Sequence, residues 1–529
     1  MMKKTFVPAA TAAVLALMSG CTKVGPDFHR IEPPELPANW SQARADENAT
    51  LSWWKIFHDD TLDRLIQTVY AQNLDLQSAG LRILQARAAL GVSEGLRYPQ
   101  VQQLSGNAAW SHRYERNFTS AAASFDLGWE TDLWGKYARG IESSEASLYA
   151  SVMSYRDLMV SVIAETARSY IAYRTAEERM AYARRNIAIQ ERVTEMTRVQ
   201  YNSGNVSELD MQQSRTTLYT TRATLPAIEL TKIKARNALA VLLATTPEHV
   251  DALLEHGGEQ RRDTLKSYLD TDRHDIVRLR EDPKSYELFL IPEARFDPAT
   301  KIDAALLLRR PDLKAAEYRA HALSAQIGVA TAELYPSFSL FGTIGYSSSD
   351  LTGNWVAAPK ALGVSFGPSF SWNIWQYDRI KNRIRIQDAR FEEALVAYDK
   401  KVIRAVADVS SAMHGYNLTK AQLVESEKAL EATLRAFNLS VTQYNNGLVS
   451  YQRLLSTVES LTRTQDRYAQ IRGALATNAI ALYKALGGGW QLSNGRRYVG
   501  SARAEQMKKR TDWGSYLDDN ATRLPGEKR

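Results

Sequence analysis

VIRAVADVSSAMHGYNLTKAQLVESEKALEATLRAFNLSVTQYNNG, residues 402–447, carries the sharpest pattern in the chain. Apolar side chains recur along it at alternating spacings of four and three residues, interrupted only by Lys420 and Glu427. A repeat of about 3.5 residues keeps one seam of a helix facing a partner helix, so the stretch predicts coiled-coil packing. The seam consists of Val402, Val406, Val409, Met413, Tyr416, Leu423, Leu430, Leu434, Phe437, Val441 and Tyr444.

A second helix with the same rhythm follows after the polar turn Asn445-Asn446-Gly447. Because the connection is so short, we expect the two helices to form an antiparallel hairpin. The first half of the chain repeats the arrangement with a weaker seam, and its turn is Asn202-Ser203-Gly204-Asn205. The second helix carries Tyr451, Leu454, Val458, Leu461, Tyr468, Leu475, Ala479, Leu482 and Leu486; the weaker seam carries Val152, Tyr155, Met159, Val162, Tyr173, Met180, Ala183 and Ile187.

The whole unit occurs twice, with a period of about 240 residues, outside the range of short solenoid repeats. Tyr335-Pro336 matches Tyr98-Pro99, and Tyr444-Asn445-Asn446-Gly447 matches Tyr201-Asn202-Ser203-Gly204. Each half reads helix, strand, strand, long helix, helix; the first helix is predicted from Thr61 to about Tyr98, where Pro99 ends it. The long helix after Tyr137 should run for about 64 residues and ~95 Å.

Between the helices, the apolar spacing changes to a period of two. Phe125, Leu127 and Trp129 alternate with acidic residues and glycine, and the segments 338–346 and 362–374 alternate in the same way. Such strands of roughly 10 residues fit a membrane barrel with a lipid-facing and a water-facing side. One chain supplies four strands, including a weaker one from Val101. Because a membrane sheet cannot leave its edges open, several copies of the chain must combine their strands, and the strand count permits two, three or more copies. Tryptophans near the strand ends predict an aromatic girdle: Trp129, Trp134, Trp372 and Trp375.

The N-terminus has the features of a secretory signal peptide. Lys3 and Lys4 precede a short apolar run, and Ser19-Gly20 lead directly into Cys21, as in the lipobox where a cysteine is acylated. Cys21 is the single cysteine of the chain, so no intramolecular disulfide framework is available. We predict a signal peptide over 1–20, an acylated extended leader over 21–60, a first repeat over 61–246, an inter-repeat linker over 247–302, a second repeat over 303–489 and a polar, basic tail over 490–529.

Composition and motifs argue against several classes of function. The formal net charge of +7 includes Lys3 and Lys4, which are removed with the signal peptide, so the mature chain carries +5. This mild excess of positive charge indicates solvated surface and no nucleic-acid partner. The chain has no zinc-protease helix motif, phosphate-binding loop or nucleophile elbow, and its eight histidines are scattered. We therefore expect no catalytic residue, no metal and no cofactor.

Several motifs together resemble the outer-membrane factor (TolC-like) family of tripartite efflux systems, in its lipoprotein branch of the NodT type. They are the lipobox, Gly25-Pro26-Asp27-Phe28, Trp53-Trp54-Lys55-Ile56-Phe57, both Tyr-Pro strand entries and both Tyr-x-x-Gly turns. The resemblance implies an α+β fold in which long antiparallel coiled-coil hairpins continue from a four-stranded contribution to a trimeric transmembrane β-barrel, as a tandem repeat. Thr22 after the cysteine implies delivery to the outer membrane, where the lipid-anchored chain would reach into the periplasm.

By the same resemblance, the function would be the duct of a tripartite efflux pump that exports small molecules such as drugs. Its partners would be two further copies, a periplasmic adaptor protein, an inner-membrane RND-type pump and outer-membrane lipid. Two alternatives stay open: the outer-membrane duct of a type I protein-secretion system, and a periplasmic lipid-anchored coiled-coil scaffold. In the family the hairpin turns gather at the periplasmic end, which makes the polar and apolar residues around them candidates for the gate: Gly204, Glu208, Asp210, Gly447, Leu448, Val449, Tyr451 and Arg453.

Overall fold

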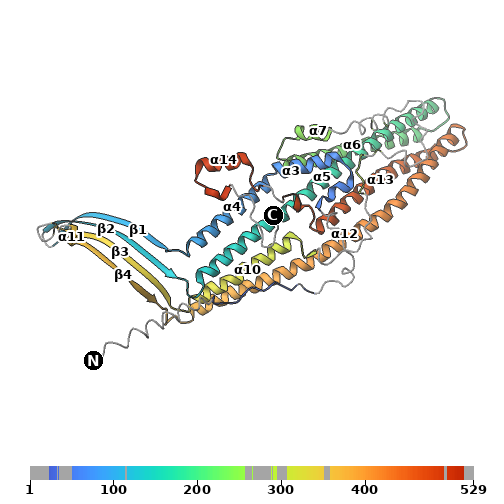
Figure 1. Cartoon of the computed structure of the whole chain (residues 1–529). Helices are drawn as coiled ribbons and strands as arrows, with labels where there is room; N and C mark the ends of the chain where they lie inside the picture. The colour runs from blue at the N-terminus through green and yellow to red at the C-terminus, as the bar shows by residue number, and fades with distance from the viewer. Residues whose placement is uncertain are drawn as a thin grey trace.

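The computed structural model describes residues 23–32, 34, 51–113, 116–255, 265, 268, 288, 290–294, 307–350, 355, 358–493 and 497–517. The molecule is elongated: four strands form a curved sheet at one end, and long helices extend away from it toward two hairpin tips at the other end (Figure 1). Among these residues, no helix combines the length and the apolar character that crossing a membrane requires.

Two helices of equal length dominate the fold. α5 (Lys136–Asn202) and α12 (Arg379–Asn445) contain 67 residues each, which corresponds to about 100 Å at 1.5 Å per residue. Each turns back into a shorter antiparallel helix, α6 (Glu208–Leu242) and α13 (Tyr451–Ala485). The two predicted hairpins are therefore present, and the structure contains the tandem repeat that the sequence indicates.

The sharp seam of α12 is buried as its period requires. Val402, Val409, Leu430, Leu434 and Phe437 are all fully buried, whereas Lys420 is exposed. The seam of α5 is weaker for a physical reason: α5 packs against α4, α6, α10 and α13 at once. A helix with neighbours on several sides buries residues around most of its circumference, so a single stripe no longer describes it.

The helix predicted from Thr61 to Tyr98 is wrong as a single element, because the chain forms α3 (Asp60–Gln72) and α4 (Leu74–Gly95) instead. Asn73 separates them. Its Oδ1 accepts a hydrogen bond from the Leu76 N–H at 2.9 Å, and its Nδ2 donates to the Leu242 carbonyl at 2.9 Å. The asparagine thus caps α4 and ties the break to the end of α6.

Two predicted boundaries also need correction. The leader is extended over residues 23–32, but Trp53–Phe57 forms a 3-10 turn (η2) whose Trp53, Trp54 and Phe57 are buried, so this part of 21–60 belongs to the core. The predicted linker begins with a helix, α7 (Pro247–Glu255), whose Val250 and Leu254 are buried in the same core. The second repeat opens with α10 (Pro311–Ala332).

The strands form one antiparallel sheet in the order β1-β2-β3-β4, with β1 (Val101–Arg113), β2 (Arg116–Thr131), β3 (Ser337–Ser349) and β4 (Leu362–Ser371). A short helix, α11 (Ala358–Ala361), precedes β4. The two central strands come from different repeats, so the sheet joins the halves of the chain. β1 and β4 are its edges.

The predicted polar, basic tail is folded where the structure describes it. It contains η4 (Trp490–Ser493), α14 (Ser501–Arg510) and η5 (Gly514–Leu517), and α14 lies alongside α4 (Figure 1).

Candidate functional site

The register of the sheet places the apolar residues of all four strands on one face. Leu104 of β1 pairs with Phe125 of β2, which pairs with Ile344 of β3, which pairs with Val364 of β4. Side chains at paired positions point to the same side of a sheet. The next two rows toward the helices continue the pattern, the first through Leu127 and Phe366 and the second through Trp129 and Leu340. These apolar side chains are exposed in the single chain.

The opposite face is polar. It carries Asp126 and Glu130 of β2 and the small or hydroxyl-bearing residues of β3 and β4, with Phe341 as an exception. Thr343 donates to Asp126 Oδ1 at 2.8 Å, and Ser124 donates to Oδ2 at 2.9 Å. A sheet with one apolar and one hydrated side is what a barrel wall between lipid and water requires.

The four predicted girdle tryptophans all lie at the helical end of the sheet. Trp129 Nε1 donates to the Arg97 carbonyl at 3.2 Å, Trp134 Nε1 to that of Pro336 at 2.8 Å, and Trp372 Nε1 to that of Leu334 at 3.0 Å. The fourth, Trp375, is 85 % exposed. Indole rings with an apolar body and a satisfied N–H suit the boundary between lipid and water, so this end of the sheet is the expected membrane surface.

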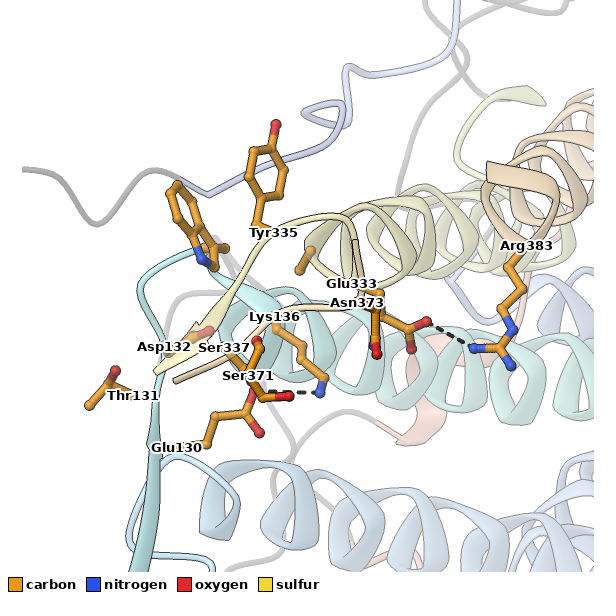
Figure 2. A pocket seen from close by; sticks show the side chains of 12 residues that line it. Glu130, Thr131, Asp132, Lys136, Glu333, Tyr335, Ser337, Ser371, Asn373 and Arg383 are labelled. Carbon is orange, nitrogen blue, oxygen red and sulfur yellow. Dashed lines mark hydrogen bonds and ion pairs between the residues drawn. The ribbon is translucent and has the colours of Figure 1, made fainter. Parts of the chain in front are cut away.

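A polar cavity of about 280 Å³ lies where the strands meet the helices (Figure 2). Lys136 at the start of α5 lies 3.6 Å from Glu130, and Arg383 of α12 makes an ion pair of 3.0 Å with Glu333 at the end of α10. The cavity is lined from both repeats, by Ser337 and Ser371 among others. Its walls are therefore polar and continue the polar face of the sheet toward the helices.

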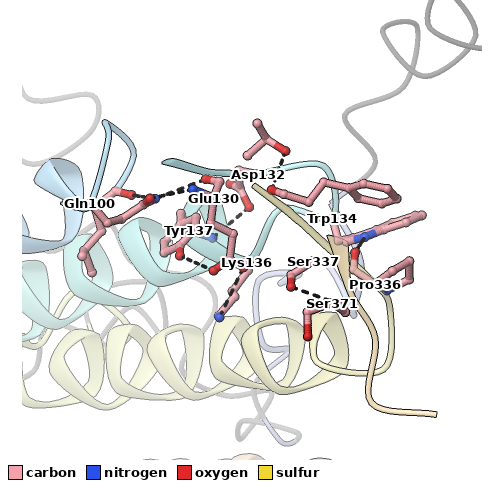
Figure 3. A network of polar contacts seen from close by, with 12 residues as sticks. Gln100, Glu130, Asp132, Trp134, Lys136, Tyr137, Pro336, Ser337 and Ser371 are labelled. Carbon is pink, nitrogen blue, oxygen red and sulfur yellow. Dashed lines mark hydrogen bonds and ion pairs between the residues drawn. The ribbon is translucent and has the colours of Figure 1, made fainter. Parts of the chain in front are cut away.

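A dense hydrogen-bond network stiffens this joint (Figure 3). Asp132 accepts from the Tyr137 N–H at 3.0 Å and the Ala138 N–H at 2.8 Å, which caps α5. Tyr137 donates its hydroxyl to Glu130 at 2.9 Å, and Gln100 exchanges two hydrogen bonds with the backbone of Glu130. Burial raises the pKa of the Tyr137 hydroxyl, and the neighbouring Glu130 carboxylate raises it further.

The leader docks at the same joint. Arg139 is only 2 % exposed, and its guanidinium donates to the Val24 carbonyl at 3.2 Å, the Gly25 carbonyl at 3.3 Å and Asp27 at 2.7 Å. The Val24 N–H donates to the Trp134 carbonyl at 3.1 Å. The hydrogen bond from Arg139 lowers the pKa of the Asp27 carboxyl, and the positive charge of Arg139 lowers it further. Cys21 lies outside the described residues.

The two hairpin turns have the geometry that their glycines predict. Gly204 has φ of +78° and Gly447 has φ of +70°, in the left-handed region where a side chain is strained.

The structure brings the gate candidates to the tips but gives them different environments. Leu448 is 73 % exposed, Glu208 and Arg453 are exposed, and Val449 is half-buried. Tyr451 is only 3 % exposed and packs edge-on against Tyr444 at 6.0 Å, so it does not point out of its own chain.

Asp210 already has a local role. Its carboxylate accepts from the Ser207 N–H at 3.0 Å and hydroxyl at 2.7 Å, while its own N–H donates to the Ser207 hydroxyl at 3.3 Å. This capping box was readable from the sequence as Ser-x-x-Asp before a helix.

Sequence reasoning missed a hydrogen bond that joins the tips. The Tyr444 hydroxyl donates to Gln200 Oε1, linking α12 to α5. The only signal was that tyrosine stands at the matching position of both turns, Tyr201 and Tyr444.

Comparison with known proteins gives consistent results. The family model described as outer membrane efflux protein matches residues 65–245 and 304–488. The chain is 25 % identical over 493 residues to the probable outer membrane lipoprotein SilC of Salmonella typhimurium, across 90 % of this chain and 98 % of that protein. It is 26 % identical over 489 residues to the cation efflux system protein CusC of Escherichia coli K12, across 90 % and 98 %. The solved outer-membrane channel OprN superposes with a TM-score of 0.74 at 28 % identity, across 89 % of this chain and all of that one.

Proposed function

The chain belongs to the outer membrane efflux protein family and is an outer-membrane efflux channel, and we propose that three copies form one duct that docks onto a periplasmic adaptor protein and an inner-membrane RND-type pump. Its place is the outer membrane, with the helices extending into the periplasm. This function supersedes the alternative of a periplasmic lipid-anchored coiled-coil scaffold, which would leave the apolar face of the sheet exposed to water.

The two-faced sheet with open edges is the observation that supports the assembly of several copies into one barrel. β1 and β4 each have one side with no partner strand among the described residues, and unpaired strand edges are not tolerated within a bilayer. Pairing β4 of one copy with β1 of the next closes a barrel, and two or three copies of four strands both reach the minimum of about eight. Three is the number that the family resemblance implies. The helices support the same assembly, because α6 and α12 carry exposed apolar side chains that a neighbouring copy would cover: Leu209, Leu230, Val241, Ile403, Leu418 and Leu439.

The docked leader supports Cys21 as the lipid anchor. Val24 is fastened to Trp134 at the helical end of the sheet, and Cys21 precedes it by three residues. Three extended residues reach about 10 Å, so an acyl chain on Cys21 would enter the bilayer beside the tryptophan belt. The relative SilC, a probable outer membrane lipoprotein, favours the same chemistry.

The duct is proposed to close at the hairpin tips. Arg453, Glu208 and Leu448 are exposed there and would meet their counterparts around the threefold axis, with Val449 behind them. Gly204 and Gly447 form the turns, and the buried Tyr451 packs behind them. The Asp210 carboxylate would take part both in the capping box and in the closing contacts. An exposed ion pair stabilises by about 0–1 kcal/mol, so three copies would make a gate that a docking adaptor can open.

Small molecules, including drugs, are the proposed cargo. The relatives include a cation efflux protein and pyoverdine export proteins, so related ducts serve chemically different exports. No described feature of the tips or of the joint selects one of these. Selection would therefore rest with the pump.

Single-channel recording of the purified protein in planar bilayers tests this proposal. The trimer should give small, mostly closed channels, and Arg453→Ala should raise the conductance without changing the trimer yield. Asp210→Ala should do the same, whereas Ser207→Ala removes the same helix cap, leaves the charge, and should not. A protein that forms no channel in any variant would contradict the duct, and equal conductance in all variants would remove Arg453 and Asp210 from the gate.

A further inference from the structure

The C-terminal segment 497–517 is a separate feature that the efflux function does not use. It lies beyond residue 488, where the family match ends. Met507, Leu517 and Val499 pack onto Leu84 of α4 in a small apolar cluster of their own. The approach is close: a Cβ on Gly80 of α4 would lie 2.1 Å from the Tyr498 carbonyl oxygen. The segment is thus held against α4 along one face and presents its other face outward.

The outward face is basic. Residues 497–517 contain five cations and two acids, which gives a net +3 in 21 residues, against +5 for the whole chain after the signal peptide. Arg503, Lys509 and Arg510 are exposed, and none of them forms an ion pair within the described residues. Cations in the last turn of α14 interact favourably with its helix dipole. This interaction explains the presence of Lys509 and Arg510, but it does not explain Arg503, which lies in the first turn.

The position of the segment separates it from the membrane. Leu84, which contacts the segment, precedes the end of α4 at Gly95 by eleven residues. At 1.5 Å per residue, the cluster that holds Ala504 and Met507 of α14 lies about 16 Å from the end of the helix, whereas Tyr516 reaches Gly91, about 6 Å from that end. Charges are screened over about 8 Å at physiological salt, and the α14 part of the segment packs farther than this from the end of α4.

The character of the face indicates the kind of partner. The exposed residues of α14 are polar, charged or alanine, and its apolar Met507 is buried. Nearby, Trp513 and Tyr516 are half-buried, and Arg87 of α4 lies over the Tyr516 ring at 5.4 Å. A folded protein partner is normally anchored by aromatic or large apolar side chains, and the exposed side of α14 carries none. A flexible polyanion needs only unpaired cations.

We propose that Arg503, Lys509 and Arg510 bind the carboxylate-bearing polymer of the periplasm, the peptidoglycan, and thereby hold the duct at a set height in the cell wall. The bond is electrostatic, between guanidinium or ammonium groups and the carboxylates of the peptide stems. It depends on the outer-membrane location of the chain but not on the trimer, the gate or the pump.

Co-sedimentation of the full-length protein in detergent with purified peptidoglycan sacculi tests the proposal. The wild type should pellet with sacculi at low salt and be released by a few hundred millimolar salt. The triple variant Arg503→Gln, Lys509→Gln, Arg510→Gln should bind at least roughly 10-fold more weakly, because each cation near an anionic surface changes binding by about fivefold. Sacculi with amidated carboxylates should bind the wild type as weakly as intact sacculi bind the variant.

Two controls separate charge from folding. The first control is a triple variant that removes three exposed cations from α5 and α6, with the substitutions Arg192→Gln, Arg215→Gln and Lys234→Gln. It should sediment with sacculi like the wild type. The conservative variant Arg503→Lys, Lys509→Arg, Arg510→Lys should bind like the wild type. Equal binding by both neutralised triples would overturn the proposal, as would retention on anionic phospholipid vesicles in place of sacculi.

Discussion

Placing an arginine at Phe366 is the most direct test of which face of the sheet meets lipid. Phe366 is 86 % exposed in the single chain and is the fifth of the ten residues of β4. It pairs with Gly342, so no side chain on β3 shields it. A strand of ten residues rises about 33 Å and spans the apolar band at a tilt, which places its fifth residue near the midplane.

The expected cost follows from that depth. Arginine on the lipid face costs about 2–4 kcal/mol at the midplane and about 0–1 kcal/mol near the interfaces. Phe366→Arg should therefore destabilise each chain by the larger amount. Phe370 lies one residue from the end of β4 and next to the belt residue Trp372, so Phe370→Arg should cost the smaller amount. Ser365 pairs with Thr343 on the polar face, and Ser365→Arg should be tolerated.

The assay is the yield of heat-resistant oligomers on gels, combined with urea titration of the protein folded into lipid vesicles. The Phe366 variant should lose most oligomer and shift its urea midpoint, while the Ser365 variant, one residue away in the same strand, should match the wild type. If the two variants assemble equally well, or the Ser365 variant is the weaker, then the assignment of the faces is refuted.

Three further outcomes follow from the helical part and the leader. Arg472→Met should lower the free energy of unfolding in urea by about 3–5 kcal/mol, because the Arg472 side chain is 2 % exposed and forms an ion pair of 2.9 Å with the fully buried Glu178. Lys428→Met, which removes an exposed ion pair, should change it by about 0–1 kcal/mol. Equal effects of the two substitutions would contradict the importance of the buried pair. Asp27→Asn should speed trypsin cleavage of the leader at Arg30, whereas the control Glu32→Gln should leave the cleavage rate unchanged. Because the pKa of Asp27 is lowered in the folded chain, its contact with Arg139 should persist at neutral pH. The contact should be lost only as the pH falls through that lowered value, below 3.8. Cys21→Ser should abolish labelling by a clickable fatty acid while some protein still reaches the membrane; persistent label would exclude Cys21 as the anchor.

Local patterns account for most of the elements. The 3.5-residue seam of 402–444 predicts α12 because a helix buries one stripe, and the alternation around Phe125 and Phe366 predicts strands because side chains alternate across a sheet. The turns at Gly204 and Gly447 follow from the left-handed backbone that glycine accepts. Each of these signals depends on residues close in sequence.

The environments of the candidate residues depend on contacts between distant parts of the chain. Tyr451 lies on the seam and also beside a turn, and only the packing of α12 against α13 shows that it faces inward. Asn73 ends α3 through a hydrogen bond to Leu242, 169 residues away, which no local pattern contains.

The sequence alone therefore determined most of the secondary structure, the repeat and the class of protein, since periodicity and motifs are local and strong. Only the tertiary structure decided that β2 and β3 from different repeats pair and bring all the apolar rows onto one face. It also decided that the leader is fastened by Arg139 and that the tail packs on α4 beside Gly80. The physical reason is that these contacts arise from the register and close approach of distant segments, which depend on how the whole chain packs.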